Sequence, residues 1–341
     1  MIGHPLRITT LGDVSGYAAA VLTVVIAASY PVATRAGVTG LFAPQDLILL
    51  RFGVGALIFL PYVLVRLPAI RRDLWVQGLP LTLFQGAGMA ALVICGLQFA
   101  PASHAAALGP GAAPAWVAVL GFLLFSKRPV IQSIVGASLC VVGVITLTSF
   151  SASVVGTAAL AGDAMFLAAS ALGALYVLQL RNWGAGPIQS AAIVTLYSAV
   201  VVIPWHLGTE SHTLWQVAPK EIFWQVLWQG VLVGCVALVA LNHAIARLGA
   251  ERSSAMVALV PVLSVLFALV FLGEIPSSME ILAILLISIG VSIGARRQPD
   301  LAKMALSSPR PTFATIWEAR RRAERPQTSR TADYPVRDSG P

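Results

Sequence analysis

The stretch LGPGAAPAW, residues 108–116, places two glycines and two prolines inside an uncharged run that extends from Ala105 to Ser126. A run of that length is long enough to cross a hydrocarbon core of about 30 Å as a helix. Proline removes a backbone donor and clashes with the preceding turn, so it breaks or kinks a helix. The stretch therefore predicts a membrane-spanning helix that is interrupted near its middle.

The rest of the chain has the composition of a membrane protein. Of its 341 residues, 57% are hydrophobic and only 11% are charged, against about 25% charged residues in a soluble domain. We predict an all-α polytopic membrane protein with ten transmembrane helices. The predicted spans are 14–34, 45–67, 75–97, 103–125, 130–149, 159–180, 187–207, 224–246, 253–272 and 278–296.

The distribution of Lys and Arg predicts the orientation, because cytoplasmic loops carry an excess of both. With both termini inside, the inner loops hold Arg66, Arg71, Arg72, Lys127, Arg128, Arg181, Arg247 and Arg252. The outer loops hold only Arg35 and Lys220. We therefore predict an N-in, C-in protein of the inner cell membrane.

The two halves of the chain repeat one another. Three pairs of markers are each 147 residues apart: Pro114 with Pro261, Pro129 with Pro276, and Gly143 with Gly290. Tyr30 and Tyr176 match at a distance of 146 residues. Each predicted unit has five helices, an odd number, so the second unit must enter the bilayer from the opposite side.

Inverted repeats of this kind are typical of secondary transporters, in which the substrate site lies near the bilayer midplane. The stretch 108–116 corresponds to ALVPVLSVL, residues 258–266, in the ninth span. Matched helix breaks are a sequence pointer to such a site. We therefore predict that Pro114 and Pro261 face a polar cavity; the alternative is that both prolines kink helices for packing alone.

The repeat also predicts how the chain is divided. Residues 14–149 form the first five-helix unit and 159–297 form the second, joined by the loop 150–158. Residues 1–13 are predicted to be cytoplasmic. Residues 298–341, rich in Pro, Ser and Arg, are predicted to be a basic, disordered cytoplasmic tail.

The segment ARLGAERSSAMVALVPVLSVLFALVFLGEIPS, residues 246–277, resembles the second half of ten-helix EamA-type permeases of the drug/metabolite transporter superfamily. LLRFG, residues 49–53, resembles an element of that family's second span. The resemblance implies a carrier that moves small metabolites through a central cavity. The first unit departs from the family pattern, because it has Ser126-Lys127-Arg128 where the family often has Gly-Glu.

Polar or bulky side chains at membrane depth are the candidate site residues, since burying them in lipid is costly without a role or a partner. We predict that Tyr30, Gln85, Trp116 and Tyr176 line the substrate cavity together with the two matched prolines. Two roles remain open for Arg51: attraction of an anionic group, or an ion pair with a neighbour. His243, beside Arg247, is either a proton relay or an interfacial histidine.

We expect no carboxylate at the membrane centre, which disfavours simple exchange of protons for organic cations. The predicted function is export of amino acids or similar zwitterionic or neutral solutes by alternating access. The alternatives are an importer or nucleotide-sugar-like antiporter of the same superfamily, and an intramembrane enzyme. We expect a small-molecule substrate and the lipid bilayer as partners, with no nucleic acid, cofactor, metal or catalytic residue, and leave a homodimer open.

Overall fold

Helices form every secondary-structure element of the described residues, and no strand occurs among them. The computed structural model describes residues 11–66, 70, 72–125, 130–154, 156–183, 187–209, 213–248 and 256–295, a few of them by backbone alone. The chain divides into residues 1–300 and 301–341. Residues 301–341, and the predicted tail as a whole, lie outside the described residues. Ser126, Lys127 and Arg128 lie outside them as well.

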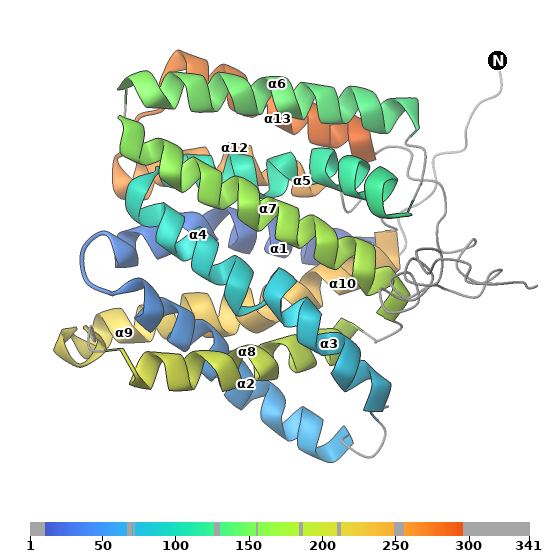
Figure 1. Ribbon diagram of the computed structural model, residues 1–341, viewed down its shortest axis with the longest axis vertical. Coiled ribbons are helices and arrows are strands. Elements are labelled where there is room, and N and C mark those ends of the chain that lie inside the picture. The colour runs from blue at the N-terminus through green and yellow to red at the C-terminus, as the bar shows by residue number, and fades with distance from the viewer. Residues whose placement is uncertain are drawn as a thin grey trace, which may run out of the picture. The chain divides into compact units, whose positions relative to one another are not determined.

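The first predicted unit folds into six helical elements (Figure 1). They are α1 (Leu11–Val38), α2 (Pro44–Arg66), α3 (Arg72–Gln85), α4 (Ala87–Phe99), α5 (Ala102–Phe125) and α6 (Ile131–Val154). Together α3 and α4 occupy the third predicted span. Pro44 begins α2 at a position where the missing N–H costs nothing, because the first turn of a helix has no partner for it.

The second predicted unit is less regular, because two of its segments are π-helices. Its elements are α7 (Thr157–Trp183), α8 (Pro187–Leu207), the 3-10 turn η2 (Leu214–Gln216), α9 (Pro219–Gln225), the π-helix η3 (Val226–Val236), α10 (Ala237–Leu248), α12 (Val260–Phe267), the π-helix η4 (Ala268–Leu272) and α13 (Ser278–Ala295). The eighth predicted span thus runs through α9, η3 and α10, and the ninth through α12 and η4.

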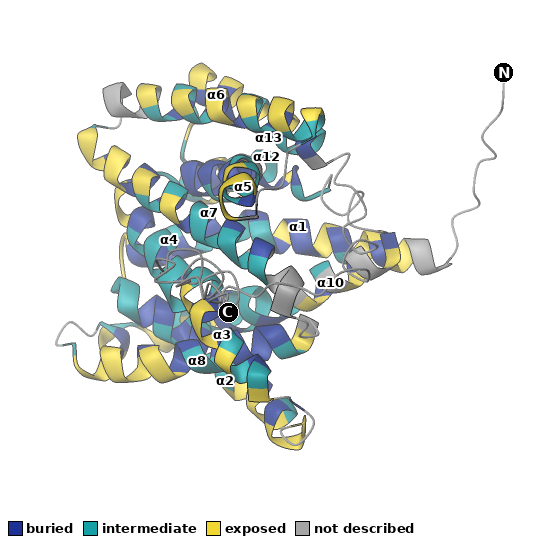
Figure 2. Ribbon diagram, turned by 45° about the vertical axis from the view of Figure 1, so that its right-hand side comes forward, coloured by how far each residue is buried: buried dark blue, intermediate teal, exposed yellow. Residues whose placement is uncertain are grey.

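Eight of the described helices are long and apolar enough to cross a membrane, and two shorter apolar helices, Val260–Leu272 and Ser278–Gly294, lie where the ninth and tenth spans are predicted. Many large apolar side chains are exposed, for example Leu57 on α2 and Val200 on α8, and Figure 2 shows exposed residues along the outer helices. A water-exposed protein rarely carries so much apolar surface. The fold is that of a polytopic membrane protein.

The predicted interruption at residues 108–116 is wrong. The helix α5 continues from Ala102 to Phe125 without a break. Prolines and glycines are tolerated in membrane helices where neighbouring helices supply hydrogen-bond partners. Here the Ser170 hydroxyl on α7 donates to the Gly109 carbonyl at 2.6 Å, which helps to stabilise the stretch.

Irregular backbone lies in the third and eighth spans, and in the ninth, where α12 begins at Val260, directly before Pro261, and continues into the π-helix η4. The third span breaks at Gly86, and the backbone N–H of Ala87 at the start of α4 donates to the Ser198 hydroxyl of α8 at 3.1 Å. The eighth span contains η3. Gly86 and Val233 are 147 residues apart, the same offset as the repeat markers. One matched pair of irregularities, at Gly86 and in η3, therefore lies one helix earlier in each unit than the paired prolines.

The helices of the two units pack in reciprocal pairs. In the first unit α4 packs on α7, and its counterpart in the second unit, α10, packs on α1. In the same way α5 packs on α7, and its counterpart α12 packs on α1. Two further close pairs, α2 with α8 and α6 with α13, join helices that correspond to each other (Figure 1). Such reciprocity is the contact pattern of a pseudo-twofold arrangement. The fourth and ninth spans, α5 and α12, are also neighbours.

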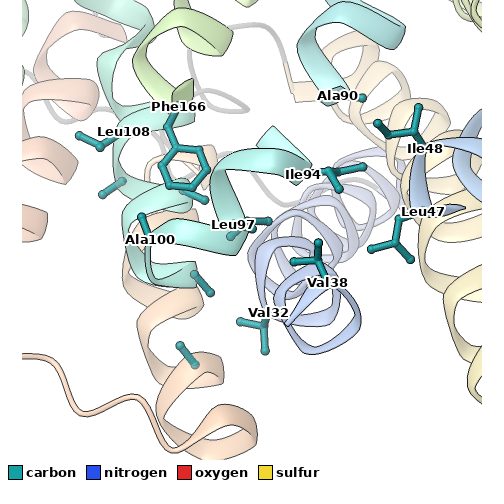
Figure 3. Packing of buried hydrophobic residues seen from close by; sticks show 14 of the residues in the cluster. Val32, Val38, Leu47, Ile48, Ala90, Ile94, Leu97, Ala100, Leu108 and Phe166 are labelled. Atoms are coloured by element: carbon teal, nitrogen blue, oxygen red, sulfur yellow. The ribbon is translucent and has the colours of Figure 1, made fainter. Parts of the chain in front are cut away.

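Small residues let the backbones approach where the units meet. A Cβ on Gly290 of α13 would lie 2.7 Å from the carbonyl oxygen of Gly136 on α6, and one on Gly136 would lie 2.6 Å from that of Gly290. Only glycine fits both positions without displacing a helix. A cluster of buried apolar side chains, among them Ile94 and Phe166, fills the space between α1, α2, α4, α5 and α7 (Figure 3).

Candidate functional site

A cavity of about 110 Å³ lies between α2, α3, α7, α8 and η3. Its lining combines apolar walls with four polar side chains, and consists of Arg51, Phe52, Gln85, Tyr176, Ala191, Val194, Thr195, Val233 and Gly234. Residues from both predicted units contribute. A largely apolar cavity with a few convergent polar groups is the usual form of a small-molecule site.

Arg51 is the basic residue of this lining. Its guanidinium carbon lies 5.0 Å from the centre of the Tyr30 ring and 5.7 Å from that of the Phe52 ring. An arginine stacked on aromatic rings is held in position without its charge being neutralised. Of the two roles left open by the sequence, an ion pair for Arg51 finds no support among the described residues, whereas attraction of an anionic group remains available.

Gln85 on α3 and Tyr176 on α7 both line the cavity. Gln85 is the last residue of α3, directly before the break at Gly86. The Tyr176 hydroxyl makes a hydrogen bond with the Ser190 side chain. Two further lining residues, Val233 and Gly234, belong to η3. Short π-helical segments frequently occur at functional sites.

The structure brings together four of the predicted site residues, because Tyr30 supports Arg51 while Gln85 and Tyr176 line the same cavity. Trp116 is half-buried on α5, and Pro261 is buried at the start of α12. Neither lines this cavity. The Pro114 side chain lies outside the described residues.

His243 lies away from the cavity as well. It is exposed on α10, with its Nε2 atom 3.3 Å from the Ser15 hydroxyl on α1. A residue in solvent contact at a helix end fits the interfacial role better than the proton relay. Within the described residues, no three His, Cys, Asp or Glu side chains are placed to hold a metal ion.

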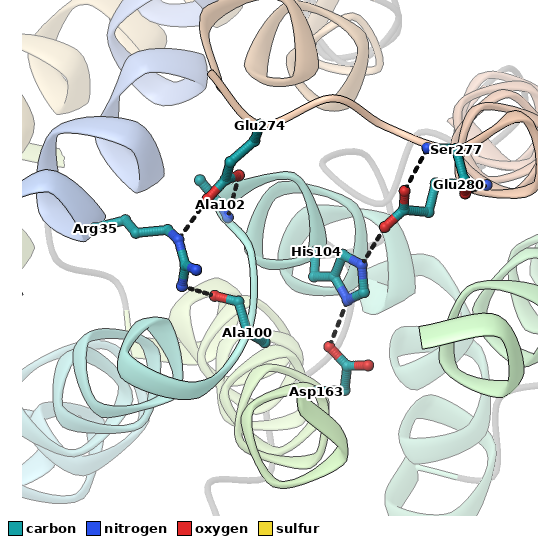
Figure 4. A network of polar contacts seen from close by, with 8 residues as sticks. All are labelled: Arg35, Ala100, Ala102, His104, Asp163, Glu274, Ser277 and Glu280. Carbon is teal, nitrogen blue, oxygen red and sulfur yellow. Dashed lines mark hydrogen bonds and ion pairs between the residues drawn. The ribbon is translucent and has the colours of Figure 1, made fainter. Parts of the chain in front are cut away.

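Charged and titratable side chains gather at one end of the bundle, where α1, α4 and α8 end and α2, α5, α7 and α13 begin (Figure 1). We call this the charged end; its members are Arg35, Asp46, His104, Asp163, His206, Glu274 and Glu280. Most of these side chains are buried. The Nε atom of Arg35 lies 2.5 Å from Oε1 of Glu274 (Figure 4).

Asp46 organises one part of the charged end. Its side chain is fully buried in the first turn of α2 and lies 2.7 Å from Nε2 of His206 at the end of α8. Its other carboxylate oxygen accepts hydrogen bonds from the backbone N–H and the hydroxyl of Thr213, at 3.1 and 2.7 Å. The Thr213 hydroxyl in turn accepts from the Ala43 N–H at 2.9 Å.

His104 is the centre of another part, and its environment differs from the one its sequence position suggested. A histidine that opens a span is expected to be a cap or an interfacial residue, yet His104 is fully buried. Its ring nitrogens contact Asp163 of α7 and Glu280 of α13 (Figure 4). The sequence contained one signal for this cluster. His104, Asp163 and Glu280 each lie in the first two turns of a predicted span, and these three spans begin on the same side of the membrane.

Comparisons with known proteins agree with this architecture. Residues 14–149 and 160–294 each match the model of the EamA-like transporter family. The threonine/homoserine exporter RhtA of Salmonella typhimurium strains SL1344 and LT2 is 28% identical over 269 residues, which cover 75% of this chain and 84% of that protein. A solved crystal structure superposes with a TM-score of 0.58 at 21% identity, over 86% of this chain and 99% of the other.

Proposed function

Because this chain belongs to the EamA-like transporter family, with a match in each half, its function is transport, and we propose that it exports amino acids or similar small zwitterionic or neutral solutes. The observation that carries the proposal is Arg51, a stacked guanidinium on the wall of a cavity between the two repeats. The relative named as a threonine/homoserine exporter supports both the solute class and the direction.

The proposed orientation is N-in, C-in with ten spans, in which 14–149 and 159–297 form inverted five-helix units. The bias of Lys and Arg toward one set of loops and the reciprocal packing of the helices support it. The charged end of the bundle then faces the outside of the cell membrane. Residues 1–13 and 298–341 then lie in the cytoplasm.

The cavity offers complementary groups for a zwitterion. Arg51 attracts a carboxylate, and its guanidinium presents paired donors that match the two carboxylate oxygens. Gln85, another lining residue, has an amide oxygen that can accept hydrogen bonds from an ammonium group. Phe52, Val194 and Val233 supply apolar contact for a short side chain.

A strongly anionic cargo, such as a nucleotide sugar, would be neutralised best by several basic groups, whereas Arg51 is the one basic side chain among the lining residues. An importer of the same solutes fits the cavity equally well, so direction rests on the exporter relative. An intramembrane enzyme would need convergent acids, bases or metal ligands. The described lining offers one arginine, one amide and two hydroxyl groups.

The test is counterflow in proteoliposomes that contain the purified full-length protein, with radiolabelled threonine, homoserine and a panel of other amino acids. Arg51→Gln is expected to lower exchange at least tenfold, since a charge-assisted pair contributes about 1.5–3 kcal/mol. Arg66→Gln, at the exposed end of the same helix, is the control and should leave exchange unchanged. Absence of exchange with every amino acid by the wild-type protein would exclude this solute class.

A further inference from the structure

The imidazole of His104 lies between two carboxylates on different helices. Its Nδ1 atom is 2.8 Å from Oδ1 of Asp163, and its Nε2 atom is 3.0 Å from Oε1 of Glu280 (Figure 4). Both distances are those of hydrogen bonds. His104 and Asp163 are almost completely inaccessible to solvent, and Glu280 is buried.

This geometry fixes the number of protons. A neutral imidazole has one N–H, so it can donate to only one of the two carboxylates, and a carboxylate has no hydrogen of its own to offer the other nitrogen. Two hydrogen bonds therefore require one additional proton, carried by the ring or by a carboxyl group. The three side chains together hold a proton that a neutral histidine and two carboxylates lack.

The surrounding groups do not supply that proton. The second Glu280 oxygen accepts from the Ser277 backbone N–H at 2.7 Å. The second Asp163 oxygen is buried with no hydrogen-bond partner among the described residues. The nearest other charges are the Arg35–Glu274 ion pair, whose glutamate accepts from the Ala102 N–H two residues before His104.

The sequence does not repeat these three residue types at the corresponding positions of the other unit. At the offsets of the repeat, His104 corresponds to Glu251, Asp163 to Tyr17 and Glu280 to Ser133. Stability alone does not require such a cluster, because apolar side chains of similar volume often stabilise a core as well as buried ionic groups do. A cluster whose residue types the sequence does not repeat, and that joins α5 of the first unit to α7 and α13 of the second, can distinguish its end of the bundle from the other.

We propose that His104, Asp163 and Glu280 form a proton-binding site, and that the bound proton holds the charged end of the bundle closed. With the proton present, α5 is bonded to both α7 and α13. Without it, one ring nitrogen and one carboxylate oxygen face each other as two acceptors, and the repulsion weakens a junction between the units. The proposed proton binding does not depend on the proposed function. Only the statement that the charged end faces the outside rests on the proposed orientation.

The first experiment counts protons. The protons bound by purified full-length protein in detergent are compared at about pH 8, where an ordinary histidine is neutral; His104→Gln is expected to bind about one proton fewer per chain than the wild type, because the additional proton of the cluster is lost. His243→Gln, at an exposed histidine away from the cluster, is the control. Asp163→Asn and Glu280→Gln, which keep the side-chain shapes, should each lose the same additional proton. Equal titration of His104→Gln and His243→Gln would overturn the proposal.

The second experiment measures closure. Spin labels at Gln98→Cys on α4 of the first unit and Ser278→Cys on α13 of the second, both at exposed positions, are introduced after the three native cysteines have been replaced. The distance distribution is expected to broaden toward longer values in alkaline buffer, and His104→Gln should show the broad distribution at every pH. A wild-type distribution that does not change with pH would contradict the closing role. Neither measurement needs a transported solute, so failure of counterflow would exclude the proposed function without affecting this one.

Discussion

Arg35 and Glu274 each bind the other and also a backbone group at the junction between α4 and α5. Besides its ion pair at 2.5 Å, the Arg35 guanidinium donates to the carbonyls of Leu97 and Ala100, at 2.8 and 2.5 Å. The second Glu274 oxygen accepts from the Ala102 N–H at 3.1 Å. The pair thus connects α1, the α4–α5 junction and the segment that follows η4.

We predict that Glu274→Gln lowers the free energy of unfolding by about 1–3 kcal/mol, because the glutamine can still accept from Ala102 but no longer neutralises Arg35. The measurement is thermal unfolding in detergent. The exchange Arg35→Glu with Glu274→Arg should not restore stability, since a carboxylate at position 35 would face two carbonyl oxygens. Restoration by that double variant would show that the ion pair alone matters and that the carbonyl contacts do not.

The sequence explains why Glu274 can reach this position. Gly273 adopts φ 67° and ψ 17°, a left-handed conformation that glycine enters without steric cost. The chain therefore turns sharply after η4 and directs Glu274 back to α5. In the first unit, the residue at the matching offset is Lys127, so an ion pair of this type cannot form between that position and a basic Arg181.

The second prediction concerns Tyr30, whose hydroxyl is buried with no hydrogen-bond partner among the described residues. Tyr30→Phe removes this group without leaving any other group unsatisfied, so the Tm should not fall. If the hydroxyl contacts the solute, the KM of transport rises by about 3- to 10-fold, the equivalent of one hydrogen bond. Tyr62→Phe, at a half-buried tyrosine on α2 that does not line the cavity, is the comparison. Unchanged KM in both variants would remove the Tyr30 hydroxyl from the site.

The third prediction concerns the contact between α6 and α13. Gly290→Ala places a methyl group within 3 Å of the Gly136 carbonyl and the Cys140 backbone nitrogen, and we expect a loss of about 1–3 kcal/mol from overpacking. Gly109→Ala is the matched control, because its added Cβ would meet no described atom within 4 Å. The free energy of unfolding of that variant should rise by about 0.5–1 kcal/mol, because alanine has a higher helix propensity than glycine. Equal Tm values for the two variants would contradict this packing.

The fourth prediction concerns the Asp46 cluster. Thr213→Val keeps the shape of the side chain but removes the hydroxyl that donates to Asp46 and accepts from Ala43. A buried carboxylate oxygen and a backbone N–H then have fewer hydrogen-bond partners, so the free energy of unfolding should fall by about 1–3 kcal/mol. Thr209→Val, at a neighbouring threonine whose hydroxyl bonds only within its own chain segment to the Trp205 carbonyl, should cost less. The measurement is chemical or thermal unfolding in detergent.

The sequence was sufficient for the helical membrane fold, because apolar run length depends on local composition alone. It also indicated Arg51, Gln85 and Tyr176, since polar side chains inside an apolar run are conspicuous. It failed on the helix break, because α5 continues through Pro110 and Pro114 while packed against α6, α7 and α12, neighbours that no local pattern contains. Tertiary contacts decided the outcome there.

The charged end shows the same limit. Asp163, Glu274 and Glu280 each look like an ordinary acidic residue near a helix terminus, where a carboxylate suits the helix dipole. What makes them a network is that His104 and Arg35 come from the other unit and meet them in space. Contacts between residues 59 and 176 positions apart, as for His104 with Asp163 and Glu280, require the packing of the units to be known.

The fifth prediction separates two candidate sites. If the cavity at Arg51 carries transport, Gln85→Leu should raise KM or lower exchange about tenfold, because it replaces a polar cavity group with an apolar one of similar size. Trp116→Ala, on α5 outside that cavity, should then retain wild-type KM.

If α5 and α12 instead enclose the solute path, as their prolines suggested, Trp116→Ala should weaken transport while membrane insertion is preserved. Insertion and folding are checked by size-exclusion profiles in detergent, so that only folded variants are compared. Loss of exchange in Trp116→Ala with none in Gln85→Leu would transfer the site to α5 and α12.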